Sequence, residues 1–204
     1  MSSSDMIYFD YNGTTPMHPE VRKMMSDCLM NNINPSNPYI SECFGNASST
    51  YSYGLESKIA LNTARQQVAK LLGCDSEEVF FTSGGTESNN IVIYGAVLNA
   101  IRAGVAEPHV IISAVEHPSV VEVVREAKRY FNVRESVLGV DKLGLVDLEQ
   151  LKEMLTPDTC LVSVMLANNE VGTVNQTKAI KAIVDAHNAR KDSRIFTVYH
   201  SDCS

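Results

Sequence analysis

The sequence lacks an excess of positive charge, and this limits the partners to be expected. Its 204 residues carry 17 Lys and Arg against 24 Asp and Glu, for a formal net charge of −7, and the basic residues form no cluster. Nucleic acids and anionic membrane surfaces are bound by basic patches, so neither is expected as a partner. A small-molecule ligand is expected instead.

Two further absences concern the compartment and metals. The first residues contain neither the apolar run of a signal peptide nor an Arg-rich amphipathic segment, so export is not expected. The five cysteines are odd in number, widely spread and without C-x-x-C spacing, which favours a reducing compartment, and we expect the protein in the cytosol. His200 and Asp202 have no third ligand nearby, so no metal site is expected.

Apolar residues, by contrast, are plentiful. They make up 44% of the chain, enough for a sizeable core. Apolar runs alternate with segments of helical period, which predicts an α/β fold with a mainly parallel sheet flanked by helices. The runs predicted to be strands, buried on both faces because their apolarity is continuous, are 77–83, 109–115, 160–166 and 194–202.

Helical periodicity predicts the elements between these strands. In the segment 118–131, one face carries an apolar stripe, and Pro118 suits a first helical turn. The stripe consists of Val120, Val124, Ala127 and Phe131. Further helices are predicted over 19–32, 55–73, 87–102, 147–155 and 177–190. The Asn-, Ser- and Pro-rich segment 33–54 is predicted to be a loop.

The stretch FFTSGGTESNN, residues 80–90, joins a predicted strand to a predicted helix through two glycines. The first N–H groups of a helix have no intrahelical acceptor and carry partial positive charge, so this helix start suits a phosphate. The Thr86 hydroxyl can cap the helix or bond a phosphate oxygen. The stretch fits neither the dinucleotide nor the nucleoside-triphosphate fingerprint, and a plain capped connection remains an alternative.

Polar residues follow the other predicted strands at their carboxyl ends, where ligands bind in open α/β sheets. They are Glu116 and His117, then Asn168, Asn169 and Glu170, and finally His200 and Asp202. Each has a structural alternative, since His117 suits a turn before proline, the Asn-Asn-Glu run a turn or cap, and Asp202 a cap. As one set they match pyridoxal 5′-phosphate, which needs a phosphate anchor, a stacking ring, an amide at its phenolic oxygen and a carboxylate at its ring nitrogen.

Several motifs carry a resemblance to a known family. They are YFDYNGTTP, FGNASSTYSYG, FTSGGTESNN, VEHPSV, MLANNEVGTV and HSD, in that order along the chain. In order and approximate spacing, the sequence resembles the cysteine desulfurase and selenocysteine lyase group, the class V branch of the fold-type I enzymes that use pyridoxal phosphate. The resemblance covers essentially the whole chain. DYNGTT, Tyr51 and MLANNE look closer to selenocysteine lyases than to typical desulfurases.

The resemblance implies roles for single residues. Gly85 and Thr86 would bind the cofactor phosphate, and Asn169 would bond the phenolic oxygen. His117 would be the catalytic residue that stacks on the pyridine ring and assists proton transfer, and Asp202 would pair with the protonated ring nitrogen. The implied reaction removes selenium or sulfur from L-selenocysteine or L-cysteine and leaves L-alanine, and the full-length family implies a homodimer.

The resemblance also implies what these residues do not contain. In the family, the lysine that binds the cofactor covalently, the catalytic cysteine loop, the substrate-binding arginine and the small C-terminal domain follow the position of Ser204. Residues 1–204 are thus expected to form an N-terminal segment and most of the cofactor-binding large domain. We expect a chain of these residues to be inactive alone and, with one sheet face uncovered, to associate.

Three alternatives remain open from the sequence. The first is a non-catalytic short form that binds or pairs with a full-length subunit. The second is a fragment of a cysteine desulfurase rather than of a selenocysteine lyase. The third is an unrelated phosphate-binding module on a doubly wound sheet, which the order of the motifs disfavours.

Overall fold

The computed structural model describes residues 7–30, 45–190 and 194–204 of the chain. It divides into two compact units, unit 1 from Met1 to Phe81 and unit 2 from Thr82 to Ser204. Most of the predicted loop 33–54 lies outside the described residues, as does Cys43.

Unit 2 is built on a parallel sheet of four strands. They are β1 (His109–Ser113), β2 (Arg134–Leu138), β3 (Thr159–Ser163) and β4 (Val198–His200), in the spatial order β2-β1-β3-β4. Each neighbouring pair is parallel, and Val110 of β1 lies opposite Glu135 in β2 and Leu161 in β3. The predicted fold class, a mainly parallel sheet flanked by helices, is confirmed.

One face of the sheet is covered by helices α3 (Gly85–Arg102) and α4 (Pro118–Phe131). Val110 and Ile112 of β1 belong to the apolar core that these helices form with the sheet. Of the predicted stripe on α4, Val120, Val124 and Ala127 are buried, and Phe131 is partly buried against the same core. The sequence period thus identifies the buried face of this helix correctly.

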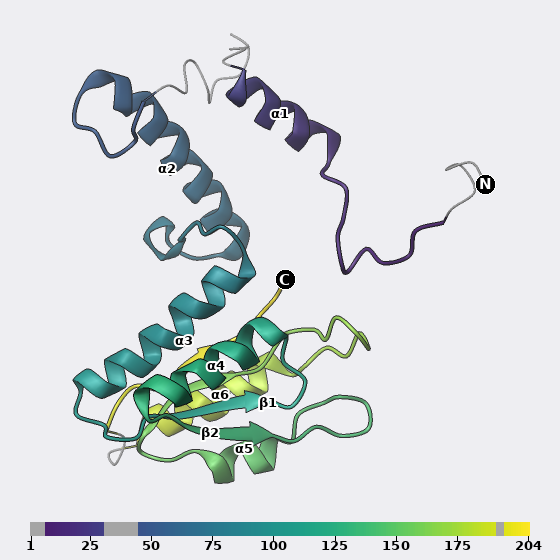
Figure 1. Cartoon of the computed structure of the whole chain (residues 1–204), viewed down its shortest axis with the longest axis vertical. Helices are drawn as coiled ribbons and strands as arrows, with labels where there is room; N and C mark the ends of the chain where they lie inside the picture. The colour runs from purple at the N-terminus through teal and green to yellow at the C-terminus, as the bar shows by residue number, and fades with distance from the viewer. Residues whose placement is uncertain (1–6, 31–44, 191–193) are drawn as a thin grey trace. The chain divides into compact units, whose positions relative to one another are not determined.

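The other face is covered by α5 (Leu148–Met154) and α6 (Thr177–Asn188). Figure 1 shows α4 and α5 on opposite sides of β1 and β2. Successive side chains of a strand point to opposite faces, so Ile111, between Val110 and Ile112, belongs to this second core. Strands β1 and β3 are therefore buried on both faces, as predicted, whereas β4 is only partly buried. The expectation of an uncovered sheet face is wrong, because α5 and α6 supply the second layer within unit 2.

The sequence does not predict strand β2. Its residues RESVL are mostly polar, and only Leu138 among them is buried. β2 lies at an edge of the sheet, with β1 as its one neighbour in the described sheet, and most of its residues are partly exposed, so it needs no apolar run. Its backbone pairing with β1 defines it as a strand.

The predicted strand 77–83 is wrong. Ser76–Glu78 form a short 3-10 helix, η2, in which the Asp75 N–H donates to Glu78 Oε2 at 2.8 Å, and residues 79–83 belong to no strand. Phe80 is 81% exposed rather than buried. A sequence of β type forms a strand only where a neighbour satisfies its backbone, and no described strand pairs with this segment.

Unit 1 contains helices α1 (Pro19–Leu29) and α2 (Ser52–Leu72) in its described residues. α2 begins within the predicted loop and ends as predicted at Gly73, whose φ of 73° lies in the left-handed region that favours glycine. α1 buries none of its residues, and α2 buries only Gly54 and Ala69. The described part of unit 1 therefore has little core of its own.

Candidate functional site

The glycine turn opens helix α3. Gly84 is the N-cap and Gly85 the first helical residue, and no side chain of the described residues caps this helix start. A Cβ atom on Gly85 would lie 3.6 Å from Ser204 Oγ, so the turn approaches the segment after β4. The Glu87 carboxylate is held by the N–H and the hydroxyl of Ser83, each at 2.6 Å. The N–H groups of the first helical turn are left to bind an anion.

His117 is the N-cap of helix α4. Its Nδ1 accepts a hydrogen bond from the Ser119 N–H at 3.1 Å and lies 2.7 Å from Ser119 Oγ. Because Nδ1 acts as an acceptor, a neutral His117 carries its proton on Nε2. The cap confirms the structural interpretation of this residue. The ring is exposed, however, and its faces can still stack on a planar ligand.

Asn89 links these elements, although the sequence analysis does not single it out. It is only 2% exposed, and its amide donates to Ser119 Oγ at 2.8 Å and to Asp202 Oδ2 at 3.0 Å. A hydrogen-bonded chain thus runs from His117 through Ser119 and Asn89 to Asp202. The signal in the sequence is a polar residue on the buried face of α3, in helical register with Ile93.

Asp202 follows β4 and is half-buried. Burial by itself would raise the pKa of its carboxyl, but hydrogen bonds from Asn89 and Ser204 and the proximity of His200 outweigh it, so the pKa is lowered. Ser204 donates to Oδ1 through its N–H at 3.0 Å and its hydroxyl at 2.7 Å. Asp202 is therefore ionised at neutral pH.

A groove of about 420 Å³ between α3 and α4 brings Thr86 and His117 together. Its other lining residues are Asn90, Tyr94, Pro118, Ser119, Glu122, Val123 and Glu126. Gly85 adjoins Thr86, and Asp202 is joined to His117 through Asn89 and Ser119. The candidate site, as used below, consists of Gly85, Thr86, His117 and Asp202 with the linking Asn89.

Asn169 is not among the residues that line this groove. It is exposed in the turn after β3, and its amide donates to Glu170 Oε1 at 3.3 Å. Its neighbour Asn168 organises the turn, because Asn168 Oδ1 accepts from the N–H groups of Glu170 (3.0 Å) and Val171 (2.9 Å). For Asn168 the interpretation as a turn residue is confirmed.

The residues present fit a phosphorylated pyridine. The uncapped start of α3 offers N–H groups to a phosphate, and the exposed ring of His117 offers a stacking face. An ionised carboxylate has about four acceptor positions. Asp202 uses three of them for Asn89 and for the N–H and hydroxyl of Ser204, which leaves one for a protonated ring nitrogen.

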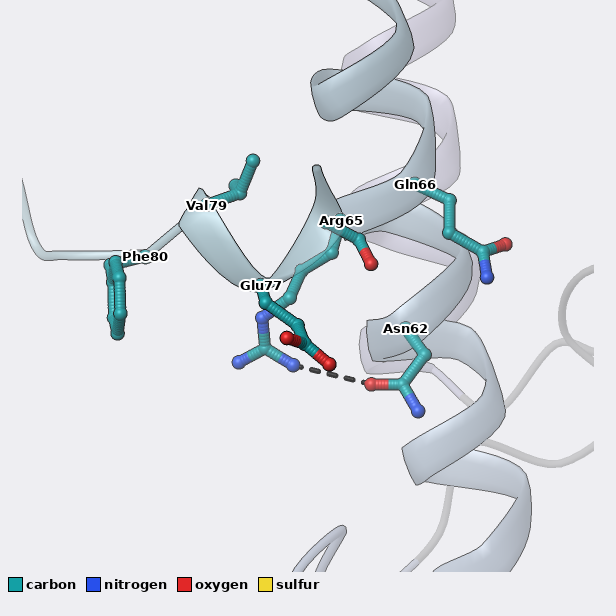
Figure 2. Close-up of a pocket in the computed structure, with 7 residues that line it drawn as sticks. Asn62, Arg65, Gln66, Glu77, Val79 and Phe80 are labelled. Carbon is teal, nitrogen blue, oxygen red and sulfur yellow. Dashed lines mark hydrogen bonds between the residues drawn. The ribbon is translucent and has the colours of Figure 1, made fainter. Parts of the chain in front are cut away.

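A separate cavity of about 410 Å³ lies in unit 1 and contains none of the predicted site residues. Figure 2 shows Asn62 and Arg65 of α2 facing Glu77 of η2 across it. The Arg65 guanidinium donates to Asn62 Oδ1 at 3.3 Å and lies 5.7 Å from the centre of the Phe81 ring. Arg65 is thus already engaged by its neighbours.

The described residues offer neither a metal site nor a membrane-spanning helix. They contain no group of three or more His, Cys, Asp or Glu side chains able to hold a metal ion. None of their helices is both long enough and apolar enough to cross a membrane.

Comparison with solved structures shows related folds. A NifS-like protein is 33% identical with a TM-score of 0.78, and the match covers 97% of this chain and 48% of that chain. The structure of SspA in complex with cysteine is 28% identical with a TM-score of 0.76, and the match covers 96% of this chain and 50% of that chain.

Curated relatives point the same way. The chain is 38% identical over 177 residues to the cysteine desulfurase IscS of Dictyoglomus turgidum, and 42% identical over 183 residues to a mitosomal cysteine desulfurase of Trachipleistophora hominis. The matches cover 87% and 89% of this chain but only 41% and 38% of the relatives. The chain therefore spans about two fifths of their length. Because the profile of the family described as Aminotransferase class-V matches residues 7–191, the chain belongs to that family.

Proposed function

We propose that the candidate site holds pyridoxal 5′-phosphate. The observation that carries this proposal is the hydrogen-bonded chain from His117 through Ser119 and Asn89 to Asp202, beside an uncapped helix start. It keeps a stacking ring and an ionised carboxylate close to the anion-binding turn. Membership of the class-V family supports the same cofactor.

Each residue then has a defined task. Gly85 and Thr86 bind the phosphate through the start of α3, and Asp202 keeps the ring nitrogen protonated. His117 stacks on the ring and assists proton transfer through Nε2, the ring nitrogen that does not cap α4. Asn169 is assigned to the phenolic oxygen by the resemblance of its motif. When bound, the cofactor supplies an electron sink for bond breaking at an amino acid.

For the whole protein we propose the release of sulfur or selenium from L-cysteine or L-selenocysteine, with L-alanine as the product. The names of the relatives, which are cysteine desulfurases, and the cysteine in the SspA structure support cysteine. The motifs DYNGTT and MLANNE support selenocysteine. We further propose a homodimer in the cytosol.

The 204-residue polypeptide itself is proposed to bind the cofactor reversibly and without turnover, because none of its lysines occupies the family's position after the aspartate. Covalent attachment requires a lysine held against the aldehyde with its amine deprotonated.

The first test is a titration of the purified chain with pyridoxal phosphate, followed by absorbance and calorimetry. Asp202→Asn removes the charge that faces the ring nitrogen, and a charged hydrogen bond contributes about 1.5–3 kcal/mol, so the affinity falls roughly tenfold or more. Asp185→Asn, on the exposed side of α6, is the matched control and leaves the affinity unchanged. Equal affinity of the wild type and Asp202→Asn would overturn the proposed site.

The second test addresses attachment and turnover. The chain is incubated with pyridoxal phosphate and reduced with borohydride, and the modified lysines are mapped by mass spectrometry. Alanine release from L-cysteine and from L-selenocysteine is measured in parallel. We expect scattered, substoichiometric labelling and no alanine above the background of the free cofactor. A single lysine labelled stoichiometrically, together with turnover, would show that the chain is complete for catalysis.

A further inference from the structure

Glu116 is a buried carboxylate for which the proposed function gives no use. It lies in the turn after β1 and is 8% exposed. Its Oε1 accepts from Ser113 Oγ at 2.5 Å and from the Met165 N–H at 2.9 Å, and its Oε2 accepts from Ser163 Oγ at 3.3 Å. All of these donors are neutral, so the carboxylate is buried at a cost that three hydrogen bonds only partly offset.

Ser163 extends the network to the next strand. Its Oγ also lies 2.9 Å from His200 Nδ1, and His200 is half-buried at the end of β4, two residues before Asp202. The chain Glu116–Ser163–His200 therefore crosses from the end of β1 over β3 to β4. A serine hydroxyl has one proton, so it can donate to only one of its two neighbours.

The direction of the hydrogen bonds follows from the charge of Glu116. An ionised carboxylate can only accept, so Ser163 must donate to Glu116 Oε2. The hydroxyl oxygen then accepts from His200, whose proton must be on Nδ1. In this state neutral His200 carries no proton on Nε2.

Protonation of Glu116 reverses every bond in the chain. Oε1 already accepts from two donors, the Ser113 hydroxyl and the Met165 N–H, so the added proton displaces neither of them when it is on Oε2. Oε2 then donates to Ser163, Ser163 donates to His200 Nδ1, and the ring proton must be on Nε2. The two states of Glu116 thus require opposite tautomers of His200.

We propose that Glu116, Ser163 and His200 form a proton relay in which Ser163 couples the protonation of Glu116 to the tautomer of His200. A proton that arrives at His200 Nε2 is balanced by transfer of the Nδ1 proton to Ser163 Oγ and of the hydroxyl proton to Glu116 Oε2. No bond between heavy atoms forms or breaks. Glu116 holds the transferred proton, and His200 exchanges protons at the end of the relay beside the candidate site.

The charged neighbours favour such a relay. Burial, and to a smaller extent the negative charge of Asp202, raise the pKa of Glu116, although hydrogen bonds from Ser113, Met165 and Ser163 oppose this. Burial lowers the pKa of His200, and Asp202 opposes it. Tyr199 also faces Glu116, and burial raises the pKa of its hydroxyl. Glu116 and His200 are thereby brought closer in proton affinity, which an exchange between them requires.

The test reads the tautomer of His200 directly and needs no cofactor, so it can fail independently of the proposed function. The two ring nitrogens are observed by 15N NMR under magic-angle spinning, which does not require a monomeric sample, and His200→Gln assigns the signals. At neutral pH we expect a protonated Nδ1 and an unprotonated Nε2. Glu116→Gln keeps its oxygen on the Met165 N–H and presents its NH₂ group to Ser163, so the two 15N signals should exchange.

Controls separate the relay from a general structural effect. Glu122→Gln, on the exposed part of α4, should leave both signals in place. In a Ser163→Ala background, Glu116→Gln should no longer change the tautomer. An unchanged tautomer in Glu116→Gln, or the same exchange without Ser163, would overturn the relay.

A wild-type measurement covers the case in which the variants do not fold. The carboxyl 13C signal of Glu116 and the ring 15N signals of His200 are followed together as the pH is lowered. We expect one common midpoint for carboxyl protonation and the tautomer exchange. Two separate midpoints would contradict the coupling.

Discussion

At the scale of single residues, buried polar side chains are tied into the sheet by specific partners. His109 of β1 is fully buried, with Nδ1 2.8 Å from Thr159 Oγ1 and Nε2 2.9 Å from Ser136 Oγ. It thus joins β1 to both neighbouring strands, at the end of the sheet that lies away from the candidate site. Because both ring nitrogens of the buried imidazole are hydrogen-bonded to neutral hydroxyl groups, the site favours an uncharged ring.

We predict that His109 makes stability depend on acid. Burial, followed by the nearby Arg134 charge, lowers the pKa of His109 to about 4 from its ordinary 6.5. Between these pH values the unfolded chain binds a proton at His109 that the folded chain excludes. The contribution of the neutral imidazole to the free energy of unfolding is therefore fully present above pH 6.5 and is lost as the pH falls towards 4. The loss by about pH 5 is roughly 2 kcal/mol.

Urea unfolding at about pH 7.5 and 5 measures this effect. His109→Gln should abolish the part of the pH dependence that comes from the imidazole, whereas the exposed His18→Asn should retain it. The prediction fails if the wild type and His109→Gln lose the same stability on acidification.

We also predict a large difference in reactivity between two thiols. Cys160 is buried in β3, and burial raises the pKa of its thiol to about 12, while its Sγ donates to the His109 carbonyl at 3.3 Å. Cys203 is exposed. Since only an accessible thiolate reacts, a maleimide or iodoacetamide should label Cys203 rapidly and Cys160 only after unfolding. Peptide mapping in native buffer and in urea checks this, and equal native rates would refute it.

At the scale of secondary-structure elements, a glycine within helix α3 and another just after its end have opposite backbone requirements. Gly95 lies exposed in the middle of the helix, and Gly104 follows its end with a φ of 86°. A Cβ atom at either position would meet no other atom within 4 Å. Any difference between them on substitution must therefore come from the backbone.

The same substitution should change stability in opposite directions at these positions. Gly95→Ala should stabilise the protein by about 0.5–1 kcal/mol, because alanine loses less backbone entropy in a helix. Gly104→Ala should destabilise it by roughly 1 kcal/mol or more, because a side chain disfavours left-handed backbone. The shift of the urea midpoint measures both, and shifts of the same sign would contradict this account of α3.

At the scale of the whole molecule, the apolar surface is divided unequally between the units. Unit 2 encloses two cores around its sheet. In unit 1, large apolar side chains are exposed, among them Phe9 at 87%, Leu71 at 84% and Phe80 at 81%. A soluble monomer rarely exposes more than a few hundred Å² of contiguous apolar surface.

We therefore predict that the chain associates in solution through unit 1. Leu71→Lys combined with Phe80→Lys adds charge at two exposed apolar positions of unit 1. The double substitution should shift light-scattering profiles towards the monomer. Leu143→Lys, in an exposed loop of unit 2, is the matched control and should have no effect. A monodisperse, monomeric wild-type chain would rule out the association.

Much of unit 2 can be predicted from the sequence because local patterns decide it. The apolar period of α4, with Pro118 at its start, is sufficient to identify that helix and its buried face. β2 escapes prediction because this edge strand has no apolar run. The segment 77–83 is mispredicted because no strand among the described residues pairs with its apolar run. Strands depend on their neighbours more than helices do.

The sequence by itself determined the parallel α/β class, the glycine turn and the polar residues at the strand ends, because periodicity, glycine and strand polarity act over a few residues. The tertiary structure decided which of these residues meet. Asn89 and Asp202 are 113 residues apart and form one hydrogen bond, and Glu116 reaches His200 only through a serine on the strand between them. Such contacts depend on strand order and on the burial of both partners, and neither is encoded in a local pattern.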